Sequence, residues 1–347
     1  MDLKQLLKEL SEMHAPTGDE EEVASFMAKE LSKTGFEVKR DVLGNVIAKK
    51  GNGKKKILIA AHMDEVSLVV LGITKEGFLK FTKVGGIYDG ILPNARLIVH
   101  GKKNILGVIG MKPPHIMKDE EIKKLQEYEQ LYVDIGVKDK AAAEALGIRP
   151  GTHMTYDSRF AEMEGGKVVG KSLDNRVGCA ILLKLAEEMR RPDCTLYLVG
   201  TIREETGLFG AGTASFGIDP DLAIAVDVTI TSGTPDMSED TIPVKMEHGA
   251  SLSVVEGGGR GLIMSKKLIE WIERVAKKKK LKLQHEVSER GATDASKMQY
   301  VKTGALVASI GVPTRYLHSY SEMTTIKDME TAKELLKGII EEFPEYE

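Results

Sequence analysis

Five short segments of the sequence place histidine or carboxylate side chains where an apolar run ends or a helix is predicted to begin. In open α/β sheets, ligands bind beyond the carboxyl ends of the strands, because loops converge there on a rigid support. Two imidazoles with several carboxylates suit Zn²⁺ or Co²⁺, and one bridging carboxylate can hold two such ions about 3.5–4 Å apart. The spacing therefore predicts a site for two metal ions. The candidate residues are His62, Asp64 and Glu65, Asp174, Glu204 and Glu205, Asp227, and His318.

Two of these segments have an internal spacing with its own chemical reason. A metal-binding histidine usually donates its second ring N–H to a carboxylate, so Asp64 is expected to orient His62. In the adjacent pair Glu204 and Glu205, one carboxylate can bind a metal while the other takes a proton from a water molecule. Adjacent side chains diverge on a regular strand. The pair is therefore expected on a turn just past the strand, which the Thr-Gly at 206–207 permits.

Each residue alone has a simpler explanation. A single histidine after a strand is more often structural, and two adjacent glutamates usually form a solvated charge run. Asp174 alone would be a helix N-cap, and Asp227 alone a turn residue. The metal hypothesis therefore depends on the joint occurrence of these residues at strand ends. His100, His153 and His248 lack neighbouring carboxylates in such a context and are expected to be structural.

The elements that must position these residues follow an α/β pattern with one interruption. Helical spacing is predicted at 2–14 and 19–34, followed by short apolar strands that end with Ile57–Ala61. From about residue 66 to 168 the sequence pattern changes to short β-like runs broken by Gly and Pro, with little helix outside 118–130. Helix and strand alternation then returns, from a helix at 174–189 to a final helix at 327–342. This pattern predicts a discontinuous catalytic domain, 1–66 and 168–347, with an inserted β-rich domain at 67–167.

Composition narrows the class of partner. A chain of 347 residues that is 42% hydrophobic can bury a large core and form more than one domain. A net charge of -3 with 29% charged residues gives no basic surface for nucleic acid and no charge block for a membrane. A peptide or another small molecule is the better expectation.

The sequence also leads to expectations about the cellular compartment and the source organism. No segment has the apolar run of a signal peptide or of a membrane-spanning helix. Cys179 and Cys194 are too few for a disulfide framework and are expected to be buried hydrophobes in a reducing compartment. We therefore expect a cytoplasmic protein. Asn and Gln number five each while Lys and Glu abound, a bias typical of thermophilic proteins.

At these residues the sequence resembles the tetrahedral (TET) aminopeptidase family. This family is also called the glutamyl or deblocking aminopeptidases, a branch of the dinuclear zinc exopeptidases. The resemblance runs the full length of the chain, through HMDE, GVIG and KPPH (107–115), SLDNRVG, GTIREETGLFGA, AVDVT, GATDA (291–295) and GVPTRYLHS. It implies a three-layer α/β/α zinc-exopeptidase-like catalytic domain with an inserted β-barrel-like dimerisation domain. It also implies that dimers assemble into a hollow tetrahedral dodecamer.

The resemblance further implies a role for each candidate and a reaction, hydrolysis of the first peptide bond of a peptide. Two divalent ions, zinc or cobalt, would polarise the carbonyl and lower the pKa of a bridging water whose proton the general base takes. One departure is Asn175, because many relatives carry a second aspartate there. The implied roles are metal binding by His62 and Asp227 and by Glu205 and His318, bridging by Asp174, general base catalysis by Glu204, orientation of His62 by Asp64, and placement of Asp294 near the substrate pocket.

Three other functions remain open from the sequence. A related metallo-amidase or carboxypeptidase shares the order of candidate residues. In those relatives, however, the extra domain typically follows the Glu-Glu pair, whereas here the long gap precedes Asp174. A glycoside hydrolase would need only two carboxylates and would leave His62 and His318 unexplained. A non-catalytic assembly protein is disfavoured by the intact Glu204. The preferred N-terminal residue is not determined by the sequence.

Overall fold

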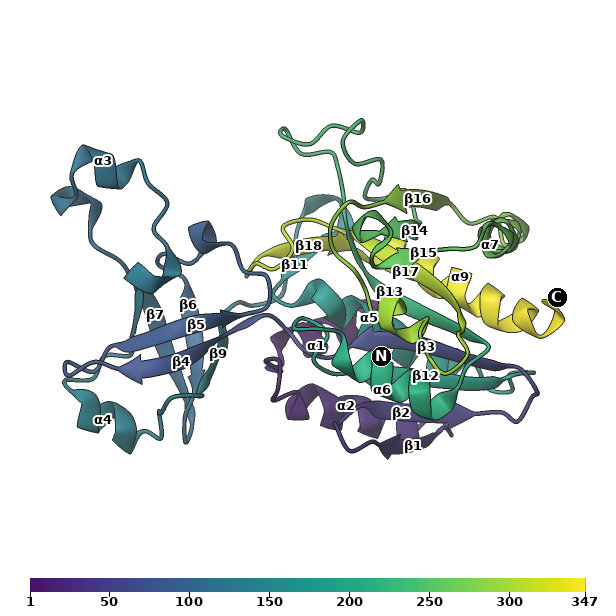
Figure 1. Cartoon of the computed structure of the whole chain (residues 1–347), viewed down its shortest axis with the longest axis horizontal. Coiled ribbons are helices and arrows are strands. Elements are labelled where there is room, and N and C mark those ends of the chain that lie inside the picture. The colour runs from purple at the N-terminus through teal and green to yellow at the C-terminus, as the bar shows by residue number, and fades with distance from the viewer. Residues whose placement is uncertain (347) are drawn as a thin grey trace.

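A mixed nine-stranded sheet forms the centre of the computed structural model, which describes residues 1–346 (Figure 1). The four central strands are parallel, so their carboxyl ends meet at one edge. The strand order is β1 (Glu37–Arg40), β2 (Val46–Lys50), β12 (Thr195–Thr201), β3 (Lys56–His62), β13 (Leu222–Ile230), β17 (Leu306–Thr314), β14 (Ala250–Glu256) and β15 (Leu262–Ile263), with β16 (Leu283–Val287) paired to β14.

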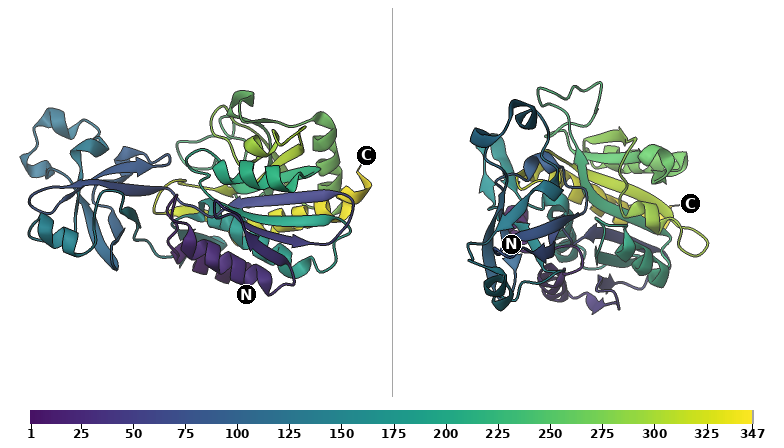
Figure 2. Two further views of the ribbon diagram at one scale, coloured as in Figure 1. Left: turned by 60° about the horizontal axis from the view of Figure 1, so that its bottom comes forward. Right: turned by 60° about the vertical axis from the view of Figure 1, so that its left-hand side comes forward.

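Two helical layers cover this sheet (Figure 2). The path from β3 to β12 includes α5 (Leu173–Glu188), and the path from β12 back across β3 to β13 includes α6 (Phe209–Ile218). Parallel crossovers are right-handed, so these opposite steps put the two helices on opposite faces. The predicted three-layer α/β/α class is confirmed. The layer of α5 also holds α1 (Leu3–Glu12), α2 (Glu21–Ser32), α7 (Lys266–Lys278) and α9 (Ile326–Glu342), and α8 (Ala295–Met298) packs with α6.

Burial explains why the central elements form. Strand β3 is Lys-Ile-Leu-Ile-Ala-Ala-His, and six of its seven residues are buried, as expected for a parallel strand covered on both faces. Helix α5 is buried almost all round, because it lies between the sheet and the outer helices α1 and α9. Helix α1 is amphipathic and begins with a capping box at Asp2. The strand ends are thus held by a rigid core.

The insert is a closed barrel with its own apolar core, at the left of Figure 1. The prediction of a β-barrel-like insert is confirmed. Its core includes Leu68, Phe81, Leu97, Ile109 and Val133, all nearly inaccessible to solvent. The barrel strands are β4 (Ser67–Ile73), β5 (Leu79–Val84), β8 (Tyr132–Asp134), β7 (Asn104–Gly110), β6 (Arg96–His100) and β9 (His153–Tyr156), with α4 (Lys140–Ala145) outside them.

The predicted helix at 118–130 is wrong. Only α3 (Asp119–Ile122) and a single 3-10 turn (Tyr128–Gln130) form there. Neither element buries a residue, so no apolar face exists to stabilise a longer helix. Within residues 1–346, no helix is both long enough and apolar enough to cross a membrane.

A small three-stranded sheet joins the barrel to the catalytic domain. It consists of β10 (Ala161–Glu162), β11 (Lys167–Gly170) and β18 (Glu322–Thr325). The last barrel strand ends at Tyr156, so β10 pairs within this small sheet rather than within the barrel. The segment between Tyr156 and residue 167 therefore lies outside the barrel strands, although the sequence pattern assigned it to the insert.

Candidate metal centre

The carboxyl ends of the central strands bring most of the candidate residues to one place. His62 is the last residue of β3, and Asp227 lies in the second half of β13. Glu204 and Glu205 lie on a turn that starts past the end of β12. His318 follows the end of the parallel strand β17, in the loop between β17 and β18, and Asp174 comes from the first turn of α5.

Asp174 lies between the two imidazoles. Its Oδ1 is 3.0 Å from His62 Nε2, and its Oδ2 is 3.3 Å from His318 Nε2. His318 Nε2 is also 3.4 Å from Glu205 Oε2, and His62 Nε2 is 3.8 Å from Asp227 Oδ1. One carboxylate thus faces two different nitrogen ligands with its two oxygens.

Two groups of side chains have the geometry of metal sites. His62, Asp174 and Glu205 form one, and His62, Glu204 and Asp227 form the other, each with ligand atoms within 4.8 Å of one another. Glu204 therefore reaches the same space as the ligand candidates, with its Oε2 3.9 Å from His62 Nε2.

The chemistry of these residues fits two divalent cations. In residues 1–346, none of the four carboxylates (Asp174, Glu204, Glu205, Asp227) forms an ion pair with a lysine or arginine. Glu205 Oε1 is buried and has no hydrogen-bond partner among these residues. Buried carboxylates need a compensating positive charge. Two divalent ions would balance four carboxylates, and mixed imidazole and carboxylate ligands suit zinc or cobalt.

Burial and crowding shift the ionisation of these acids in different directions. Burial raises the pKa of Glu204 and of Asp227 well above their ordinary values, and raises that of Glu205 to about 7. Burial also opposes ionisation of Asp174, but hydrogen bonds from His318 and His62 outweigh it and lower its pKa. The central carboxylate is thereby kept charged while its neighbours hold protons more readily.

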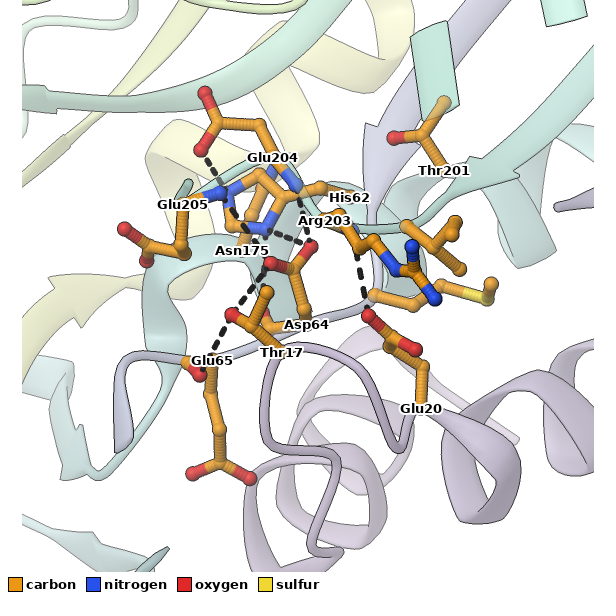
Figure 3. A network of polar contacts seen from close by, with 12 residues as sticks. Thr17, Glu20, His62, Asp64, Glu65, Asn175, Thr201, Arg203, Glu204 and Glu205 are labelled. Carbon is orange, nitrogen blue, oxygen red and sulfur yellow. Dashed lines mark hydrogen bonds and ion pairs between the residues drawn. The ribbon is translucent and has the colours of Figure 1, made fainter. Parts of the chain in front are cut away.

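Asp64 holds both the histidine and the glutamate turn (Figure 3). It is fully buried, and its carboxylate accepts the backbone N–H groups of Glu204 at 3.0 Å and of Glu205 at 3.3 Å. The Thr17 hydroxyl donates to it at 2.8 Å. Nδ1 of His62 is 3.5 Å from Asp64 Oδ1 and 3.2 Å from its backbone carbonyl. This arrangement accords with an orienting role, since it fixes the imidazole and the turn together.

Glu322 was not singled out from the sequence, although it contacts two of the candidates. It is buried, and it accepts the backbone N–H of Asp174 at 2.9 Å and of His318 at 2.7 Å. His318 has a φ of +58°, a left-handed conformation that costs a residue with a side chain about 1–2 kcal/mol. Glu322 helps to hold that conformation. A carboxylate four residues after His318, at the start of a short strand, was the only signal.

Asn175 has a structural role that an aspartate could not fill completely. Its side-chain amide donates to the carbonyl of Val226 at 2.7 Å, and its Oδ1 accepts the N–H of Gly178 at 2.9 Å. The first bond ties the start of α5 to β13, immediately before Asp227. The second satisfies a free N–H at the helix start, as expected for this position.

The other residues singled out from the sequence lie outside the two ligand groups. Asp294 is buried behind the site, accepts a hydrogen bond from the Thr201 hydroxyl at 2.5 Å and does not line the cavity, although 291–293 do. Burial raises its pKa to about 6. His100 and His153 lie in barrel strands, and His248 contacts the carbonyl of Met246.

A cavity of about 630 Å³ opens beside the metal centre. It extends along the ends of β13, β14 and β16, so it joins the candidate ligands to a second set of polar side chains. These are Thr229, Ser253, Glu256, Glu286, Ser288, Arg290 and Thr293.

Comparisons with known proteins agree with one another. A family model described as M42 glutamyl aminopeptidase matches residues 44–335. A lysyl aminopeptidase from Pyrococcus furiosus is 31% identical over 342 residues, which are 97% of this chain and 96% of that protein. An aminopeptidase from the archaeon Desulfurococcus kamchatkensis has a similar structure, with a TM-score of 0.95, 36% identity and coverage of 99% of this chain and 96% of that chain.

A second similar structure is described with its assembly. The TET1 peptidase of Pyrococcus horikoshii, which can assemble into a tetrahedron or a large octahedral shell, is 30% identical with a TM-score of 0.89. The match covers 98% of this chain and 99% of that chain.

Proposed function

The chain belongs to the M42 glutamyl aminopeptidase family and is a hydrolase of peptide bonds, and from that premise we propose that it removes residues from peptide N-termini with two divalent metal ions. The observation that carries the two-metal part is Asp174, whose two carboxylate oxygens face the imidazoles of His62 and His318. A single-metal site would need no such shared ligand.

The proposed ligand sets are those that the family resemblance implies, and the short distances between the imidazoles and the carboxylates support them. His62 and Asp227 would hold one ion, Glu205 and His318 the other, and Asp174 both. Zinc and cobalt are the candidates, because imidazole and carboxylate ligands suit either. When bound, the ions supply Lewis acidity that polarises the scissile carbonyl and makes a water molecule more acidic.

Glu204 is the proposed general base. Its side chain is about 10% exposed, and it lines the cavity beside the ligands without being required by either proposed set. The carboxylate would accept a proton from the attacking water and later give it to the leaving amine. Asp64 helps to keep Glu204 in place, because the Asp64 carboxylate accepts the backbone N–H of Glu204.

Hydrolysis of aminoacyl-arylamides and their N-blocked counterparts tests the proposal. The panel should be run before chelation, after chelation, and with Zn²⁺ or Co²⁺ restored. We expect cleavage of free N-termini only, loss of activity on chelation, and recovery with metal. Cleavage that survives complete chelation would contradict the proposal, and cleavage of blocked substrates alone would favour the amidase alternative. Chelation-resistant hydrolysis of a glycoside with no cleavage of arylamides would favour the glycoside hydrolase.

A homo-oligomer is the second part of the proposal. The similarity to a peptidase that forms tetrahedral and octahedral shells supports it, as does the barrel insert, which leaves the catalytic domain on one side (Figure 1). We propose a dodecamer built from dimers. A cytoplasmic location and a thermophilic source stay predictions from composition.

A further inference from the structure

The cavity beside the metal centre determines which peptides fit, and the inference rests on the proposed function. A peptide whose first carbonyl lies at the metal centre must put its first side chain into adjoining space. The cavity of about 630 Å³ is that space, because the same cavity is lined by His62, Glu204 and His318 at one end. Its far wall therefore contacts the N-terminal residue of the substrate.

Glu286 is the central charge of that far wall. It lies on β16, directly opposite Ser253 of β14. Its Oε2 accepts two hydroxyl hydrogen bonds, from Thr229 at 2.5 Å and from Ser253 at 2.8 Å. Both hydroxyl residues are buried, so the carboxylate is held at a fixed place. In residues 1–346, its other oxygen, Oε1, has no hydrogen-bond partner and is left for a ligand.

Glu256 adds a second carboxylate to the same wall. It is only 3% exposed, and it accepts the Thr293 N–H at 3.0 Å and the Thr293 hydroxyl at 3.1 Å. Burial raises its pKa, and the nearby charge of Glu286 raises it further. A cation placed near these two carboxylates would relieve that repulsion.

Among the lysine and arginine side chains of residues 1–346, Arg290 is the one that lines this cavity. It is exposed, and it forms no ion pair there that would hold it over the cavity. Water and salt screen an exposed charge, whereas a fixed and partly buried carboxylate acts through a lower dielectric. The anchored carboxylates therefore outweigh the arginine in setting the sign of charge that the pocket prefers.

We propose that this pocket selects peptides whose N-terminal residue carries a basic side chain, lysine or arginine, and that Glu286 is the specificity-determining residue. The cationic head group would donate hydrogen bonds to Glu286 Oε1, with Glu256 close by. The aliphatic stem of either side chain would fill the cavity between the metal centre and these acids.

The unaltered enzyme gives the first test. With metal restored, kcat/KM is measured for Lys-, Arg-, Leu-, Met- and Glu-p-nitroanilide. We expect Lys and Arg to exceed Leu by about tenfold or more, because hydrogen bonds to a charged group contribute that much, and Glu to be the poorest. Added salt should reduce the ratio of Lys to Leu. A preference for Glu, or no preference for Lys and Arg over Leu, would overturn the inference.

Glu286→Gln removes the charge but keeps an oxygen for Thr229 and Ser253. We expect the ratio of kcat/KM for Lys over Leu to fall about tenfold or more. Glu289→Gln is the matched control: this exposed glutamate lies three residues further along and does not line the cavity, so the ratio should stay as in the unaltered enzyme. An equal loss on every substrate would place Glu286 at a part common to all peptides, such as the α-amine, and would overturn the inference.

Two failures can be told apart. If neutral arylamides are cleaved in a metal-dependent way but basic ones are not preferred, the inference fails and the proposed function stands. If no substrate of the panel is cleaved with either metal restored, the proposed function fails and the inference fails with it. Inhibition of Leu-p-nitroanilide cleavage by free lysine and by free norleucine checks the preference without a variant, and equal inhibition would count against it.

Discussion

At the scale of single residues, Glu204 and Glu205 are adjacent in the chain but have different surroundings. Glu205 Oε2 is 3.4 Å from His318, whereas Glu204 Oε2 is no closer than 3.9 Å to an imidazole. Adjacent carboxylates on a turn can therefore divide two tasks, one binding metal and one moving a proton.

The Glu204→Gln variant should keep its bound metal but lose most of its peptidase activity. Gln cannot accept the proton, so we expect kcat to fall about 10²–10⁴-fold, while metal content by elemental analysis stays near that of the unaltered enzyme. Glu205→Gln is the contrasting variant and should lose bound metal. Near-normal turnover of Glu204→Gln would exclude it as the base.

Glu322→Ala should weaken metal binding without removing a ligand. Its carboxylate holds the backbone of both Asp174 and His318, so its loss frees two ligands from their orientation. We expect about a 10–100-fold lower metal affinity, measured by competition with a chelator. A Co²⁺ absorption spectrum would report the altered geometry directly. An unchanged affinity and spectrum would mean that the two bonds are not needed.

The ligand candidates could be predicted from sequence because each follows a strong local pattern, an apolar strand or a helix start. Glu322 could not, because the two N–H groups that it accepts are 148 and 4 residues away in the chain. Glu256 and Glu286 were missed for the same reason. Their place in the cavity depends on which strands become neighbours.

At the scale of elements, one buried ion cluster fixes the turn after β3 to three other segments. Glu65 accepts the N–H of Ala15 and pairs with Lys171, just after β11, and with Arg176 of α5. Arg176 also donates to the carbonyls of Leu10, Met63 and Asp64, the last two directly after the proposed ligand His62. The three charged side chains are buried, so the cluster acts as one unit.

Glu65→Gln should destabilise the fold. It leaves Lys171 and Arg176 buried without their carboxylate, a loss of about 3–5 kcal/mol, which should lower the apparent midpoint of thermal unfolding. Glu162→Gln is the control: it breaks only the exposed pair with Lys4, which contributes under about 1 kcal/mol. Equal midpoints for both variants would contradict the role given to the cluster.

The same cluster predicts an acid-dependent loss of stability. Burial opposes ionisation of Glu65, but Lys171 and Arg176 outweigh it and lower its pKa from 4.5 to about 2. Its contribution, about 3 kcal/mol, is therefore complete above pH 4.5 and is lost as the pH falls toward 2. The difference in unfolding midpoint between the unaltered protein and Glu65→Gln should shrink over that range. A constant difference would contradict the assignment.

The long apolar strands and amphipathic helices were predictable, because burial of one face leaves a periodic pattern. The short strands β10, β11 and β18 were not. They consist of two to four residues, and their pairing partners lie far away in the chain: Val168 pairs with Thr324. The helix at 118–130 failed for the opposite reason, because its local pattern favoured a helix that nothing packs against.

At the scale of the whole molecule, the barrel carries outward-facing apolar side chains. Strand β7 alternates, with Gly107 and Ile109 buried and Leu106 and Val108 49% and 40% exposed. Tyr88, Ile116 and Ile122 are more exposed still, and all belong to the insert. The catalytic domain also exposes apolar side chains, such as Phe216 and Ile263, but on β7 two of them lie on the same outer face of one strand. Neighbouring exposed apolar side chains are typical of an interface. The sequence indicated an insert, but only the resemblance indicated an association domain, because a strand pattern does not reveal what covers its outer face.

The double variant Leu106→Asp and Val108→Asp should therefore break the assembly. A dodecamer of this 38.0 kDa chain has a mass of about 456 kDa, which light scattering after gel filtration resolves from smaller species. Two carboxylates buried in an apolar interface without partners are strongly unfavourable, so we expect dimers or monomers with unchanged far-UV circular dichroism. Val42→Asp, at a fully exposed position between β1 and β2, should keep the large species. A double variant that stays at the full mass would place the contacts between subunits elsewhere on the molecule.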